Sequence, residues 1–292
     1  MTLYELIEQP DLDDPVLVLA LDGWIDAGGA ASVAVETLAD ELDTVTVARF
    51  ATDELLDYRA RRPVVHLVDG VQRGLTWPSI ELRAAADLDG KELLILAGAE
   101  PDRLWHQFSD EVTELALQFG VRLCVGLGAY PAATPHTRPP RVACTASTPR
   151  LAEVGFLQAS LDFPAGIQAA IEQRCDGRGI PAVGLWAQVP HYIVPTQMPY
   201  PAASVALVEA LGQVAELSLP LGDLPTRAET TRARLDELIA NNPEHQAMLR
   251  QLEAAHAQDE PPERLDAGGE LPTGDELAAE LERFLRDQRG DG

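Results

Sequence analysis

Residues 121–146 read VRLCVGLGAYPAATPHTRPPRVACTA. The apolar run at 121–127 predicts a buried strand, and we expect the chain to leave the sheet at Gly128. The loop that follows contains four prolines, whose fixed φ angles lower the entropy lost on ordering it. Because open α/β proteins present binding surfaces in the loops after buried strands, this stretch predicts both an α/β fold and a candidate site.

Apolar runs on both sides of this stretch predict the rest of the sheet. Further strands are expected at 16–21, 44–50, 63–68, 92–97 and 182–188, with an antiparallel extension at 81–86 and a short strand at 141–147. Helices are expected from the glycine turn to about 42 and at 104–119, 167–175 and 199–217, and a loop at 73–78. Strands that alternate with helices predict a mainly parallel sheet with helices on both faces.

The composition changes at about residue 225, where helix-forming residues replace the alternating pattern. We expect two helices at 226–240 and 244–257, a polar, flexible linker near 258–270 and a last helix at 277–286. The chain is therefore divided into an α/β domain, residues 1–222, and a helical C-terminal extension, residues 223–292.

The composition excludes several classes of partner. Asp and Glu number 47 against 22 Lys and Arg, so the formal net charge is −25. Such a chain is repelled by nucleic acids and anionic lipids, and no run approaches the ~18 apolar residues of a membrane span. The beginning of the chain lacks signal-peptide features, and three widely spaced cysteines predict reduced thiols rather than a disulfide framework. We expect a cytoplasmic protein that binds neither nucleic acid nor membrane.

Three predicted strand ends carry unusual polar groups, and in a parallel sheet their loops open on the same edge. Asp22, Trp24 and Asp26 follow the first long strand, His136, Thr137 and Arg138 lie in the proline loop, and His191 and Tyr192 follow residue 190. The arginine suits a phosphate or carboxylate, and Gly28 and Gly29 would open a helix start that favours anions.

These residues define a candidate site. Its ligand-binding candidates are Asp22, Trp24, Gly28, Gly29, Thr137, Arg138 and Tyr192, and its catalytic candidates are His136, His191 and Asp26. The alternative for each histidine is structural, with the ring bonded to backbone carbonyls in a tight loop. For the two glycines the alternative is close packing of the turn.

Patterns for known cofactors and nucleophiles are missing from the sequence. It contains no GxGxxG fingerprint, P-loop, GxSxG elbow or CxxC pair, and its single lysine, Lys91, precedes a strand. His136 and His191 are 55 positions apart, a spacing that specifies no metal site. We therefore expect neither a metal nor a cofactor, and the residues specify no reaction.

Several motifs together resemble the PAC2 family, and its actinobacterial branch with a helical C-terminal extension fits best. They are GWIDAG at 23–28, LTWP at 75–78, GAEPD at 98–102, LGAYP at 127–131, PHTRP at 135–139 and WAQVPHY at 186–192. The resemblance implies a three-layer α/β/α fold similar to that of purine nucleoside phosphorylases, often assembled as a trimer.

The same resemblance implies a binding or assembly protein related to proteasome assembly chaperones, with itself and proteasome components as partners. Archaeal relatives that bind the proteasome end in a hydrophobic–tyrosine–any-residue tail, whereas this chain ends in Arg289-Gly290-Asp291-Gly292. The alternative is a small-molecule enzyme or sensor, with a phosphorylase- or hydrolase-like activity on a nucleoside or another anionic metabolite.

Overall fold

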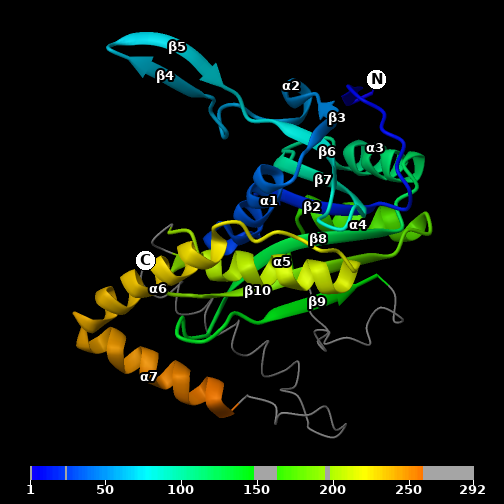
Figure 1. The fold of residues 1–292 in the computed structure, drawn as a ribbon. Coiled ribbons are helices and arrows are strands. Elements are labelled where there is room, and N and C mark those ends of the chain that lie inside the picture. The colour runs from blue at the N-terminus through cyan, green and yellow to red at the C-terminus, as the bar shows by residue number, and fades with distance from the viewer. Residues whose placement is uncertain (1, 24, 148–162, 195–197, 259–292) are drawn as a thin grey trace, which may run out of the picture.

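A computed structural model describes residues 2–23, 25–147, 163–194 and 198–258 (Figure 1). The strands are β1 (Tyr4–Leu6), β2 (Val16–Asp22), β3 (Val45–Phe50), β4 (Val64–Val68), β5 (Val71–Thr76), β6 (Ile80–Ala86), β7 (Glu92–Ala99), β8 (Leu123–Ala132), β9 (Val142–Ala146) and β10 (Ala182–Pro190). The helices are the 3₁₀ turn η1 (Ala27–Gly29), α1 (Ala30–Glu41), α2 (Thr52–Leu55), α3 (Trp105–Gln118), α4 (Ile167–Gly177), α5 (Pro201–Ala215), α6 (Leu224–Ala240) and α7 (Pro243–Gln258).

Eight strands form one twisted sheet in the order β1-β3-β6-β7-β2-β8-β10-β9. Its centre, β7-β2-β8-β10, is parallel, and the pairings outside it are antiparallel. Since β3 runs in the same direction as these four, five of the eight strands share one direction. The prediction of a mainly parallel sheet is confirmed, including the antiparallel extension at β6.

Two hydrophobic cores lie on opposite faces of the sheet. One packs apolar residues of β2, β8 and β10 against α1, α5 and α6, and includes Val125, Leu185 and Leu207. The other packs the opposite side chains of the strands against α2, α3 and α4, and includes Leu94, Phe108 and Ile171. Strand residues alternate between these cores, as the period of two requires. The three-layer α/β/α architecture is therefore confirmed.

The predicted strand at 63–68 forms, but it lies outside the main sheet. Among the described strands it pairs with β5 alone, and this two-stranded hairpin projects from the body, in cyan in Figure 1. The prediction of a loop at 73–78 is wrong over residues 73–76, which belong to β5. Every residue of both strands is exposed, so an apolar run that resembles a core strand is instead a surface element.

The prediction that the chain leaves the sheet at Gly128 is also wrong, because β8 continues to Ala132. Gly128 pairs with Trp186 and Pro131 with Val189, so β10 supports the strand along its whole length. Gly128 therefore serves packing across the sheet and does not end the strand.

The two predicted helices after residue 225 are present as α6 and α7, which lie at the end of the molecule opposite the hairpin (Figure 1). The linker near 258–270 and the last helix at 277–286 fall outside the described residues, except for the end of α7. The division into domains at residue 222 stays a prediction. None of the described helices has the length and apolar character needed to cross a membrane.

Candidate functional site

The loops after β2, β8 and β10 open on the same edge of the sheet, because these three strands are parallel neighbours. Their polar side chains, however, lie in two neighbourhoods. One is a docking region for α6 and α7, and the other is a cavity beside α4. Trp24 lies outside the described residues.

The start of α1 is already occupied by a carboxylate of the chain itself. Asp26 accepts hydrogen bonds from the backbone N–H of Ala31 at 2.7 Å and from the N–H and hydroxyl of Ser32 at 3.0 and 2.6 Å. Burial raises the pKa of Asp26, hydrogen bonds from Ser32 and Ala31 lower it in part, and the nearby Asp22 raises it further. The amides that would hold an external anion therefore already have a partner.

Gly28 and Gly29 have positive φ angles of 63° and 61°, which L-residues with side chains rarely adopt. The carbonyl of Gly28 accepts a hydrogen bond from the backbone N–H of Tyr200 at 2.9 Å. A Cβ on Gly28 would lie 3.0 Å from that of Tyr200. The two glycines thus form a tight turn that packs against the start of α5.

His136 is buried, and its ring bonds on both sides. The hydroxyl of Tyr192 accepts from the backbone N–H of His136 at 2.8 Å and lies 2.7 Å from its Nδ1, while Nε2 is 3.1 Å from Oδ1 of Asp236 on α6. Because the carboxylate of Asp236 only accepts, Nε2–H donates to it, and Nδ1 of the neutral ring then accepts from the Tyr192 hydroxyl. Burial is the main cause that raises the pKa of Tyr192 to about 12.

Thr137 and His191 complete the same region. The hydroxyl of Thr137 donates to Glu253 of α7 at 2.7 Å. His191 packs edge-on against Tyr192 with ring centroids 5.5 Å apart, and its Nδ1 lies 3.4 Å from the carbonyl oxygen of Ala132. Arg138 closes the turn of the loop through its backbone N–H, which donates to Pro135.

The structure therefore brings His136, Thr137, His191 and Tyr192 together, but around the C-terminal helices. Asp26 and Asp22 lie instead at the end of β2, where the backbone carbonyl of Asp22 accepts from Glu100. The ligand-binding and catalytic roles of these residues stay predictions. Asp236 and Glu253, which sequence reasoning missed, carry no signal beyond an ordinary charged helix surface.

A cavity of about 170 Å³ lies at the ends of β2 and β8, beside the start of α4. Its walls carry three carboxyl groups, those of Asp26, Glu100 and Glu172. Burial raises the pKa of Glu172 to about 7, although a hydrogen bond from the side-chain amide of Gln168 at 3.0 Å lowers it in part. Sequence reasoning missed this site except for Asp26.

Three glycines on β8 and β10, at positions 126, 128 and 184, leave room on the sheet for side chains that line the cavity. Gly126 pairs with Gly184, and Gly128 pairs with Trp186. A Cβ on Gly126 would overlap the ends of Gln168 and Glu172, and one on Gly128 would overlap the Trp186 ring. The repeated glycines were the signal available in the sequence, since glycine inside a strand often marks a close approach of other groups.

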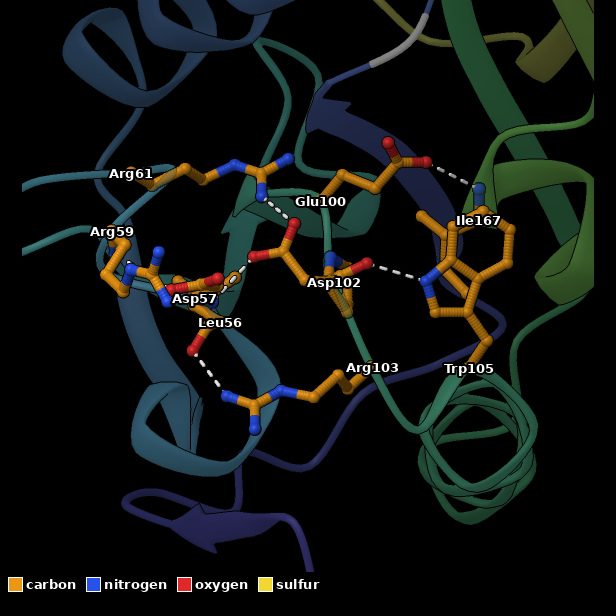
Figure 2. A network of polar contacts seen from close by, with 10 residues as sticks. Leu56, Asp57, Arg59, Arg61, Glu100, Asp102, Arg103, Trp105 and Ile167 are labelled. Carbon is orange, nitrogen blue, oxygen red and sulfur yellow. Dashed lines mark hydrogen bonds and ion pairs between the residues drawn. The ribbon is translucent and has the colours of Figure 1, made fainter.

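The segment from Glu100 to Trp105 runs from a residue of the cavity wall to contacts with the chain that leads into the hairpin, and Figure 2 shows these contacts. Oε1 of Glu100 accepts from the N–H of Ile167 at 2.8 Å, at the start of α4. Asp102 accepts from the N–H of Asp57 at 2.7 Å and forms an ion pair with Arg61. Burial raises the pKa of Asp102, but these hydrogen bonds outweigh it and lower the pKa below its ordinary value.

Two further hydrogen bonds hold the same segment in place. Arg103 donates to the carbonyl of Leu56 at 2.8 Å, and the indole N–H of Trp105 donates to the carbonyl of Pro101 at 2.6 Å (Figure 2). The GAEPD motif at 98–102 is therefore the anchor that fixes the base of the hairpin against the sheet.

Comparison with known proteins gives a consistent result. The model of the PAC2 family matches residues 20–239. A Mycobacterium tuberculosis protein of unknown function is 37% identical, with a TM-score of 0.83 over 87% of this chain and 91% of that one. A Corynebacterium glutamicum protein of unknown function is 34% identical, with a TM-score of 0.84 over 90% of this chain and 99% of that one.

A third relative has a more informative description. A Mycobacterium tuberculosis proteasome-assembly chaperone homologue is 35% identical, with a TM-score of 0.74 over 82% of this chain and 99% of that one. Among curated proteins, none matches the sequence.

Proposed function

Because the chain belongs to the PAC2 family, we propose that it is a binding and assembly protein, related to proteasome assembly chaperones, that acts through protein surfaces. The similarity to a proteasome-assembly chaperone homologue over 99% of that chain supports this role. We place the activity in the cytoplasm, in agreement with free thiols at Cys124, Cys144 and Cys175.

The observation that carries the proposal is the hairpin β4–β5. Its apolar side chains are exposed, with Val64 at 59%, Leu67 at 62%, and Val68 and Val71 at 51%. Successive strand residues point to opposite faces, so both faces of the hairpin are apolar. Proteins rarely leave such a surface in water unless a partner covers it.

The hairpin is also held in position before any partner binds. Tyr58 and Trp77, at its base, pack edge to face with ring centroids 5.0 Å apart. The ion pair between Arg61 and Asp102 fixes the incoming chain (Figure 2). A preorganised arm loses less conformational entropy on binding, which favours association.

Charge favours a second copy of this chain as the occupant. Residues 58–77 contain four arginines and one aspartate, whereas the whole chain has a net charge of −25. The arm is thus a positive, apolar element on an acidic protein, and another copy offers the complementary acidic surface. We infer that the arm supports self-association, and the family resemblance leads us to expect three copies.

Substituting Leu67→Glu should raise the dissociation constant of the oligomer by roughly 10- to 100-fold, because a buried leucine contributes about 1.5–3 kcal/mol at each contact. Size-exclusion chromatography with light scattering measures the mass over a dilution series. Leu238→Glu, at a residue 54% exposed on α6, is the matched control and should keep the wild-type mass. Self-association through the hairpin is contradicted by a monomeric wild-type protein, or by equal masses for wild type and Leu67→Glu.

The assembly role has a separate test with purified proteasome components. We expect the protein to co-elute with free proteasome subunits and to bind mature core particles at least about tenfold more weakly, since an assembly factor must dissociate from its product. Biolayer interferometry measures both affinities. Absence of binding to subunits and to particles at tens of micromolar would reject the proteasome as a partner.

A further inference from the structure

The cavity beside α4 is lined by acidic side chains, whereas the sequence predicted a site for an anion. Its walls include the carboxyl groups of Asp26, Glu100 and Glu172, and no Lys, Arg or His among the described residues. An anion would meet like charges without a compensating positive side chain from the described lining, whereas a cation would meet opposite charges in a partly desolvated space.

Glu172 has bonding capacity that the chain does not use. Both oxygens of Asp26 accept hydrogen bonds from the start of α1, and Glu100 accepts from Ile167. Glu172 accepts from Gln168 through Oε1 only, and its Oε2 receives no hydrogen bond from any described residue. The side chain of Glu172 is partly buried and lines the cavity. A carboxylate oxygen that borders a cavity and receives no hydrogen bond from the described residues can accept one from a ligand.

The remaining walls suit an organic group. Ile25, Leu127, Phe163 and Trp186 supply apolar and aromatic surface. The indole N–H of Trp186 already donates to the hydroxyl of Thr145 at 2.9 Å, so the ring contributes its apolar and π surface. Cations are attracted to the faces of aromatic rings, tryptophan most strongly.

A bare metal ion fits this arrangement less well. In the described part of the chain, no group of three His, Cys, Asp and Glu side chains is arranged to hold a metal. The carboxyls of Asp26, Glu100 and Glu172 line the cavity together with apolar side chains. Carboxyls with aromatic walls match a cation that carries an apolar body.

We propose that the cavity between β2, β8 and α4 binds a small protonated amine, whose ammonium donates to Oε2 of Glu172 and whose apolar part packs against Trp186 and Phe163. The glycines at 126, 128 and 184 make room for these side chains on the sheet. This ligand site goes beyond the assembly role, and it does not depend on the hairpin.

The pH dependence of binding follows from the groups around Glu172. Asp26 and Glu100 line the same cavity, and the thiols of Cys124 and Cys175 lie near enough to interact with the charge of Glu172. Because burial raises the pKa of Glu172 to about 7, its carboxylate forms only as the pH reaches that value. Amine affinity should thus rise about tenfold per pH unit below 7 and level off above it.

Isothermal titration calorimetry at pH 8 with matched probes tests the proposal. Benzylamine and butylamine carry the ammonium, benzyl alcohol and butanol are neutral isosteres, and butyrate is an anion of similar size. We expect the amines to bind and the alcohols and butyrate to bind at least about tenfold more weakly. The neutral probes report apolar packing alone, so the difference isolates the ammonium.

Two variants assign the interaction to one residue. Glu172→Gln keeps the shape of the side chain and should weaken amine binding at least about tenfold, while Glu209→Gln, at an exposed position on α5, should leave it unchanged. Each of three results would overturn the proposal: amines and alcohols of equal affinity, full amine binding by Glu172→Gln, or no amine binding at ten millimolar. Thermal unfolding of each variant without ligand shows that it is folded, so loss of binding is not loss of structure.

Discussion

Glu172→Gln should stabilise the protein at pH 8, and its advantage over the wild type should grow by about 2–3 kcal/mol between pH 5 and pH 8. Glu172 has a pKa of about 7 in the folded protein against an ordinary value of 4.5. The folded state therefore binds the proton more tightly than the unfolded state. The contribution of this tighter proton binding to the free energy of unfolding is fully present below about pH 4.5. It decreases as the pH rises and is lost once the pH passes 7. Glutamine stays neutral, so the variant avoids that loss.

Urea unfolding at pH 5, 6, 7 and 8 measures the difference, provided that the slope of the free energy against urea is the same for both proteins. Glu209→Gln is the control, and its stability relative to the wild type should be nearly independent of pH. A difference for Glu172→Gln that stays constant from pH 5 to pH 8 would mean that Glu172 is well solvated in the folded protein. That result would also remove the basis for the pH dependence of amine binding.

Gly98→Ala should destabilise the fold by about 3 kcal/mol or more, the largest loss that we expect from a single methyl group. Gly98 has a φ of 120°, where side chains are strained, and a Cβ there would overlap the carbonyl oxygen of Ser79. That oxygen accepts the hydrogen bond from Ala99 at 3.0 Å where β6 begins beside β7. The neighbouring atoms are backbone, so no side-chain rotation relieves the overlap.

Gly90→Ala is the matched control for this substitution. Gly90 has a φ of 85°, and a Cβ added to it has no atom within 4 Å. The Gly90→Ala variant should therefore lose only roughly 1–2 kcal/mol of stability, which comes from backbone strain at a positive φ. Thermal and urea unfolding of the two variants separate steric overlap from strain. Equal losses in both would show that β6 and β7 tolerate a side chain at Gly98.

Some elements form where local apolar periodicity predicts them, and others depend on contacts between distant segments. Strands β2, β7 and β10 and helices α3 and α5 were predictable because their apolar periodicity is local and agrees with their burial. The parallel pairing at the centre of the sheet was also predictable, because parallel strands need crossover connections and helices occur between these strands in the sequence. The run at 63–68 has the same apolar character, but its side chains remain in water. The local sequence predicts that a strand forms here. Whether other elements cover the faces of that strand depends on the whole fold.

The candidate site follows the same division. Parallel strands place the loops after β2, β8 and β10 on one edge, and that much was predictable from topology. Which side chains meet there depends on helices distant in the sequence. α6 and α7 supply Asp236 and Glu253 to the loop of His136 and Thr137, whereas α4 places Glu172 over Gly126.

The sequence by itself determined the alternation of strands and helices, the family and the edge of the sheet where polar loops gather, because backbone preference and hydrophobic period act over a few residues. Only the tertiary structure decided that the histidine loop contacts the C-terminal helices, that the apolar hairpin stays exposed, and that Glu172 lies over Gly126 in the wall of a cavity. Burial, desolvation and hydrogen-bond partners arise from contacts between distant segments, so residue type alone does not specify them.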